Sequence, residues 1–100
     1  MPGIVRVGDL CSGHGCYPPR PAIEGSPNVF MNGRAIVREG VDKFAVHCKY
    51  CGKNPNCHQS VVTKASSSVF ANGIEIARIG DPVGCGSACA QGSTDGFGGG

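Results

Sequence analysis

The 100-residue sequence has no tryptophan, and only 6% of its residues are aromatic. It has no basic run with interleaved aromatic side chains, so nucleic-acid binding has no support. No apolar run is long enough for a transmembrane helix. No stretch follows the 3.6-residue periodicity of an amphipathic helix, because glycine and proline interrupt every run. These absences predict an all-β, loop-rich domain.

Large apolar side chains are also scarce, whereas the chain has 17 glycines and 7 prolines. A domain of this size and composition buries only a thin core, so it should need a metal ion or disulfide bonds as a cross-link. The seven cysteines and three histidines supply candidates for both. We expect one domain over residues 1–100, without a signal peptide and made in a reducing cytoplasm, which favours a metal.

One stretch occurs twice, forty residues apart. Residues 29–40 (VFMNGRAIVREG) are echoed by residues 69–80 (VFANGIEIARIG), with Val, Phe, Asn-Gly, Ile, Arg and Gly at the same offsets. Asn-Gly is the strongest two-residue hairpin signal, because both positions of a type I′ turn need a positive φ. Each copy therefore predicts a β-hairpin. The expected cross-strand partners are Phe30 and Ala35 in the first copy, and Phe70 and Glu75 in the second.

The two chain ends carry the halves of a third copy. Residues 4–9 (IVRVGD) match residues 76–81 (IARIGD), which form the second half of a repeat. Residues 92–97 (GSTDGF) match residues 25–30 (GSPNVF), which begin one. We therefore expect a third hairpin split between the termini, with the three hairpins arranged around a pseudo-threefold axis. The alternative is that residues 98–100 form only a tail.

Three loops connect the repeated strands, at residues 10–24, 41–64 and 82–91. Each carries residue types that bind metals: His14 stands between two glycines in the first loop, and Cys85 does so in the last. The middle loop contains His47, Cys48, Cys51, Cys57 and His58. Loops around one axis converge at one end, and four His or Cys side chains there would satisfy a tetrahedral Zn²⁺. The middle loop would have to supply two of the four ligands.

Together these motifs resemble the PAAR-repeat family, which forms the conical spike tip of contractile injection machines, namely phage tails and type VI secretion systems. The family's Arg-x-Gly-Asp motif stands at residues 4–9 and 76–81, with a blurred version at residues 36–42. Its Gly-Ser-Pro-x-Val-Phe-x-Asn-Gly signature stands at residues 25–33. The resemblance covers essentially the whole chain. The loop at residues 11–21 looks more like the phage-tail members.

The resemblance implies a small conical or pyramidal domain with a metal near its apex, held by three histidines and one cysteine. Carried over by position, the ligands are His14, His47, His58 and Cys85. The expected metal is zinc, with iron as the alternative. His47 is the weakest member of the set, because its neighbour Cys48 could take its place.

The resemblance also implies a non-catalytic function. The chain would cap a trimeric β-helical spike protein, one copy per trimer, and sharpen it for piercing the target cell envelope. It would meet the target membrane transiently and bind no small-molecule substrate or nucleic acid. It would be made in the bacterial cytoplasm, then reside at the virion tail tip (the phage baseplate spike) or be injected. The arginines at one slot of the three repeats, Arg6, Arg38 and Arg78, are either a solvated face or contacts with this partner.

Two other functions stay open from the residues alone. An enzyme would need an open zinc position and a general base, yet the acidic residues stand in hairpin or repeat positions, so we expect no enzyme. The second alternative is a small zinc-knuckle-type metal-binding adaptor, not attached to a spike, that uses Cys48, Cys51, Cys57 and His58. The cysteines outside the ligand set could be reduced, joined in disulfides or bound to a second metal; they are Cys11, Cys16, Cys48, Cys51, Cys57 and Cys89.

Overall fold

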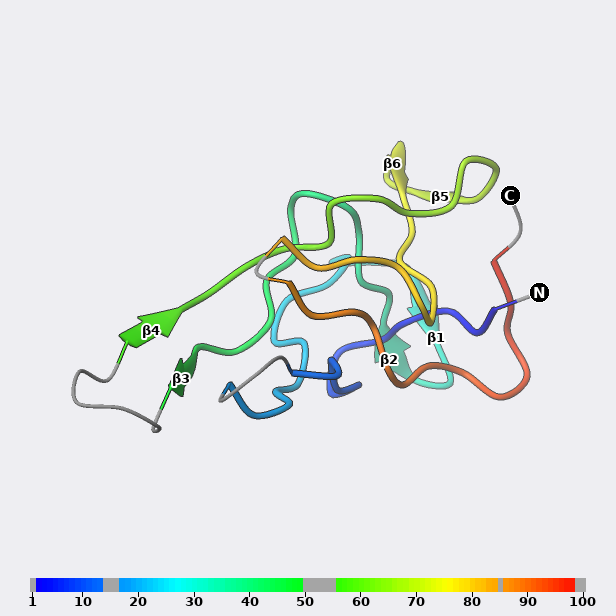
Figure 1. The fold of residues 1–100 in the computed structure, drawn as a ribbon. Coiled ribbons are helices and arrows are strands. Elements are labelled where there is room, and N and C mark those ends of the chain that lie inside the picture. Colours follow the sequence, from blue (N-terminus) through cyan, green and yellow to red (C-terminus); the bar gives the residue numbers. More distant parts are fainter. Residues whose placement is uncertain (1, 14–16, 50–55, 85, 99–100) are drawn as a thin grey trace.

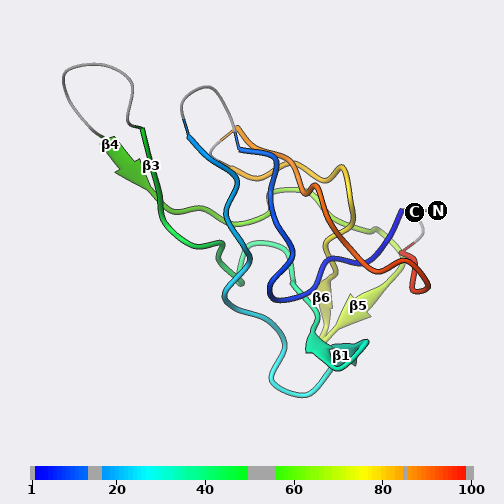
Figure 2. The ribbon, with the colours of Figure 1, turned by 90° about the horizontal axis from the view of Figure 1, so that it is seen from below.

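The computed structural model describes residues 2–13, 17–49, 56–84 and 86–98. Within these ranges the fold is all-β, with three two-stranded antiparallel sheets and no helix that could span a membrane. The sheets pair β1 (Phe30–Met31) with β2 (Arg34–Ala35), β3 (His47–Lys49) with β4 (Asn56–His58), and β5 (Phe70–Ala71) with β6 (Ile74–Glu75). The molecule measures 43 × 24 × 20 Å. Sheet β3–β4 lies at one end, whereas the other two sheets and both chain ends lie toward the opposite end (Figures 1 and 2).

The Asn-Gly dipeptides form the two predicted hairpin turns. Asn32 and Gly33 have φ values of 57° and 77°, and Asn72 and Gly73 have nearly the same values, 55° and 76°. Positive φ at both central positions is the requirement of a type I′ turn. The predicted register is confirmed in both copies: Phe30 pairs with Ala35, and Phe70 pairs with Glu75.

The two chain ends lie side by side. Gly3 and Phe97 form an antiparallel bridge, and the Ile4 amide donates to the Gly96 carbonyl at 3.0 Å. The expected pairing of the ends is therefore present, but as a short bridge and not as a two-stranded sheet. The third sheet is instead β3–β4, within residues 41–64, where the sequence motifs predict only a loop. This stretch has no Asn-Gly turn, so the local signal that predicted the other hairpins is missing there.

A closed ring of three backbone hydrogen bonds holds the centre of the molecule. Val5 donates to Ala77 at 2.9 Å, Ala77 donates to Val37 at 2.9 Å, and Val37 donates to Val5 at 3.0 Å. All three residues are 0% exposed. Each stands immediately before one of the repeated arginines. The ring therefore joins the same position of three separate segments.

The apolar core consists of two small clusters. One surrounds the ring and contains Val5, Cys11, Ala22, Val37, Phe44, Val62, Ala65, Ala77, Val83 and Cys89. The other comprises Ile4, Ile36, Ala71 and Ile76, with Val29, Met31 and Val69 packed against it. Most of these side chains are small or β-branched, in keeping with the scarcity of large apolar residues in the sequence.

Each repeated arginine is paired with an aspartate in its own turn. The three pairs are Arg6 with Asp9, Arg38 with Asp42, and Arg78 with Asp81. In the middle pair, Nε and Nη2 of Arg38 donate to the two carboxylate oxygens of Asp42 at 2.7 and 2.9 Å, and the Arg38 backbone amide adds a third bond. Donation of its side-chain hydrogen bonds to the Asp42 carboxylate raises the pKa of Arg38. These arginine side chains are only 12–13% exposed, so their clearest role is to fasten the turns. Their contact with a partner stays a prediction.

Three buried serines fasten the start of each repeat in the same way. The hydroxyl of Ser26 accepts the backbone amides of Asn28 and Val29, and Ser66 and Ser93 each accept the amides two and three residues further on. The Ser26 hydroxyl also donates to Oδ1 of Asn72, while that of Ser93 donates to Oδ1 of Asn32. Serines thus connect one repeat to the turn of another.

Glu39 and Glu75 form a like-charged contact between repeats. Burial raises the pKa of Glu39, and the hydrogen bond and charge of Glu75 raise it further. A raised pKa means that the folded chain holds this proton more tightly than the unfolded chain. The stabilisation is therefore complete below the ordinary glutamate pKa of 4.5 and is lost as the pH rises through the folded pKa. Glu39→Gln should therefore raise the free energy of unfolding at pH 7 by about 0.5 kcal/mol.

Urea unfolding of Glu39→Gln at pH 7 and pH 3.5 tests this expectation. The difference from the wild type should vanish at pH 3.5, where Glu39 is protonated in both states. Glu75→Gln serves as the control, because removing the other charge of the pair should give a similar gain at pH 7. A loss of stability at pH 7 in either variant would contradict the assignment.

Candidate metal centre

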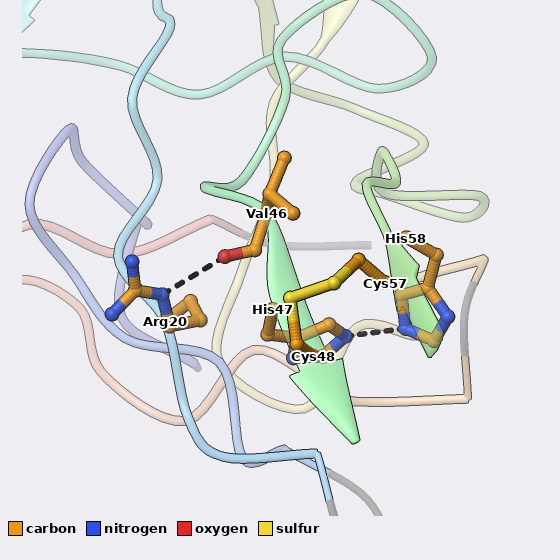
Figure 3. Close-up of a disulfide and its surroundings, with 6 residues drawn as sticks. All are labelled: Arg20, Val46, His47, Cys48, Cys57 and His58. Carbon is orange, nitrogen blue, oxygen red and sulfur yellow. Dashed lines mark hydrogen bonds between the residues drawn. A yellow bond between two sulfur atoms is a disulfide. The ribbon is translucent and has the colours of Figure 1, made fainter. Parts of the chain in front are cut away.

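Sheet β3–β4 places two imidazoles opposite each other. His47 and His58 are direct cross-strand partners, and their Nε2 atoms face one another within hydrogen-bonding contact (Figure 3). Their ring centroids are 4.4 Å apart, with an interplanar angle of 61°. His47 is 4% exposed, whereas His58 is partly exposed. The register of the hairpin alone therefore brings together two of the four predicted ligands.

The surroundings of His47 leave its Nε2 atom as an electron-pair donor. Its Nδ1 atom lies 2.9 Å from the carbonyl oxygen of Pro18. Because a carbonyl can only accept, Nδ1 carries a hydrogen, and in the neutral imidazole Nε2 then carries the lone pair. Histidines that bind metals usually donate their other ring N–H to such a group, which fixes the tautomer and the ring orientation. The same lone pair could accept an N–H from His58, so in the observed geometry the two rings share a hydrogen bond. A tetrahedral metal ion bound to both nitrogens would require the two rings to move apart.

Tyr17 packs against both imidazoles. Its ring stacks on that of His58, with centroids 4.1 Å apart and an interplanar angle of 20°, and lies 4.9 Å from that of His47. Tyr17 and Pro18 belong to the first loop, whereas the histidines belong to the middle one. The first loop therefore contributes both an aromatic cover and a carbonyl acceptor to the histidine pair.

A disulfide joins the register pair next to the histidines. Cys48 and Cys57 are cross-strand partners with a Cα–Cα distance of 4.0 Å (Figure 3). Successive residues of a strand point to opposite faces, so the disulfide and the imidazoles lie on opposite sides of the hairpin. The bond settles the state of these two cysteines. It also uses two of the four residues that the zinc-knuckle alternative requires as ligands.

Arg20 ties the first loop to the strand that carries His47. Its Nε donates to the carbonyl of Val46 at 3.1 Å (Figure 3). A small pocket of about 120 Å³ opens at this contact, lined by Pro18, Arg20, Val46, His47 and Cys48. The last loop meets the first through the Ser12 amide, which donates to the Ala88 carbonyl at 2.8 Å. All three loops are thus linked through the first.

The other two predicted ligands, His14 and Cys85, lie outside the described residues. Within the described part of the chain, no group of three or more His, Cys, Asp or Glu side chains is placed to hold a metal ion. The structure therefore brings His47 and His58 together. The complete set of four ligands stays a prediction.

Sequence reasoning missed the mirror symmetry of the middle loop. It reads His47-Cys48 on one side and Cys57-His58 on the other. An antiparallel pairing of these dipeptides matches His with His and Cys with Cys, as observed. The contacts of Tyr17 and Pro18 carried no comparable signal, because they depend on tertiary proximity between two loops.

Comparison with protein-family models and with curated proteins finds no match for this chain.

Proposed function

We propose that this protein is a non-catalytic, metal-stabilised tip that caps a trimeric β-helical spike of a contractile injection machine. One chain would present three similar faces to the three chains of the spike, while its opposite end forms the point. The observation that carries the proposal is the closed hydrogen-bond ring of Val5, Ala77 and Val37. The resemblance of the repeated motifs supplies the identity of the machine.

The ring supports a pseudo-threefold axis. Each of its members donates to one neighbour and accepts from the other, which is the pattern that a threefold rotation generates. Away from the ring, each repeat also contains one equivalent Arg–Asp pair and one equivalent buried serine. A single chain with this arrangement can match a true trimer without breaking the symmetry of its partner.

Three exposed phenylalanines supply a docking surface at one end of the molecule. Phe30, Phe70 and Phe97 occupy the same repeat position and are 56%, 54% and 48% exposed. Strands β1 and β5 and the C-terminal segment that carry them lie toward the end opposite β3–β4 (Figure 1). Large exposed aromatic residues are typical anchors of protein interfaces. The blunt end of a trimer offers three equivalent sites, one for each ring.

The metal would act at the other end. His47 and His58 would bind it from β3–β4, and His14 and Cys85 would bind it from the first and last loops, so that one ion ties the three loops into a rigid point. A structural zinc contributes about 10–16 kcal/mol of apparent binding energy in small peptides, which equals or exceeds the stability of a typical domain. The protein supplies shape and rigidity, and the machine supplies the force.

Alanine substitution of the three phenylalanines tests the docking surface. Each single variant should bind the trimeric spike protein of the same genome about tenfold or more weakly, and the triple variant should not bind measurably. The melting temperature should change little, because the rings are about half exposed. Val46→Ala is the matched control: this residue is 45% exposed but precedes β3 at the opposite end. Wild-type affinity in the triple variant would refute this surface.

A further inference from the structure

Cys11 and Cys89 face each other across an antiparallel bridge between the first and last loops. The Ser12 amide donates to the Ala88 carbonyl at 2.8 Å on one side, and the Ala90 amide donates to the Leu10 carbonyl at 3.0 Å on the other. Because the flanking residues make the hydrogen bonds, the cysteines form a non-hydrogen-bonded pair. In such pairs the Cα atoms are about 4.5 Å apart and the side chains are closest.

Both cysteines are free thiols in the structure, each 2% exposed within the same apolar cluster. Disulfides usually join Cα atoms about 4.4–6.8 Å apart, so the expected spacing of this pair is within reach of a bond. The same chain already joins a direct cross-strand pair, Cys48 and Cys57, at 4.0 Å. The backbone therefore needs little movement to allow a second bond.

We propose that Cys11 and Cys89 form a cross-strand disulfide that closes residues 11–89 into a covalent ring. The oxidant is a low-molecular-weight disulfide such as oxidised glutathione. One cysteine thiolate attacks it to give a mixed disulfide and releases one glutathione thiolate. The second cysteine then displaces the other glutathione. The two cysteines lose two electrons and two protons, and the two glutathione molecules gain them.

The environment of the pair determines when this exchange occurs. Burial raises the pKa of Cys89 to about 12, and the nearby carboxylates of Asp81 and Asp9 act in the same direction. Only a thiolate attacks a disulfide, so the native dithiol reacts slowly. The bond should form while the chain is folding, before the pair is covered. The disulfide proposal depends neither on the proposed metal site nor on the proposed contact with a spike.

The first test maps the bond. The full-length chain is refolded with reduced and oxidised glutathione, free thiols are alkylated under denaturing conditions, and peptides are sequenced by tandem mass spectrometry. The expected product links Cys11 to Cys89. Fragment ions of the linked peptides distinguish Cys11 from Cys16 and Cys89 from Cys85. Native reduced protein treated with the same mixture should acquire this link at least tenfold more slowly. Recovery of Cys11 and Cys89 as alkylated thiols after refolding would overturn the proposal.

The second test measures what the ring does to stability. A cross-link across a loop this long should raise the melting temperature by at least about 10 °C. Reduction also breaks Cys48–Cys57, so the double variant Cys11→Ala/Cys89→Ala provides the reference. The difference in melting temperature between oxidised and reduced forms should be larger in the wild type than in this variant. Equal differences would overturn the proposal, and the peptide map decides the case if the variant does not fold.

Discussion

Purified His58→Ala protein is expected to contain less than one tenth of the metal of the wild type, and to melt at least about 10 °C lower. The reason is the geometry at β3–β4, where the Nε2 atoms of His47 and His58 face one another and Pro18 fixes the tautomer of His47. Elemental analysis and thermal unfolding, with and without a chelator, measure both effects. Chelation should lower the melting temperature of the wild type and leave that of the variant unchanged.

The double variant Cys48→Ala/Cys57→Ala is the matched control for the histidine result. It removes the disulfide from the opposite face of the same hairpin but keeps both imidazoles. We expect it to retain about one metal ion per chain, with a lower melting temperature from the lost cross-link. Under the zinc-knuckle alternative it would lose the metal instead. Full metal content in His58→Ala would also contradict the proposed centre.

Asp42→Ala is expected to lower the free energy of unfolding by about 3 kcal/mol. The Asp42 side chain is 3% exposed and accepts three hydrogen bonds from Arg38, one from its backbone and two from its guanidinium. Removing the carboxylate leaves a largely buried arginine without the acceptor that now neutralises it. Urea unfolding at pH 7 measures the loss.

Two further variants distinguish the loss of the Arg38–Asp42 ion pair from general damage to the fold. Arg38→Met/Asp42→Ala should recover part of the loss, because no unpaired charge is left inside the turn. Asp95→Asn changes an aspartate on the surface, hydrogen-bonded to Asn32 and Ser93, and should perturb stability much less. Wild-type stability in Asp42→Ala would show that the Arg–Asp pairs do not stabilise the repeats.

The hairpins β1–β2 and β5–β6 could be predicted from the sequence because their signal is local. Asn-Gly fixes the turn, the turn fixes the register, and repetition at forty residues shows that both copies obey the same rule. The approach of the chain ends was predictable for a related reason, since Phe97 stands where Phe30 and Phe70 stand. These inferences needed no knowledge of tertiary contacts.

The hairpin β3–β4 and the use of the arginines could not be predicted in this way. The first depends on cross-strand pairs, histidine with histidine and cysteine with cysteine, that become visible only once an antiparallel register is assumed. The second depends on turn geometry: Asp9 stands three positions after Arg6 and Asp42 stands four positions after Arg38, yet both pairs form an ion pair. Sequence spacing alone left open whether these arginines point to solvent, to a partner or to their own turn.

Native mass spectrometry of this chain mixed with the trimeric spike protein of the same genome tests the central claim most directly. The account predicts a complex of three spike chains, one copy of this protein and one metal ion. A complex with three copies per trimer, or the absence of any complex at micromolar concentrations, would contradict it.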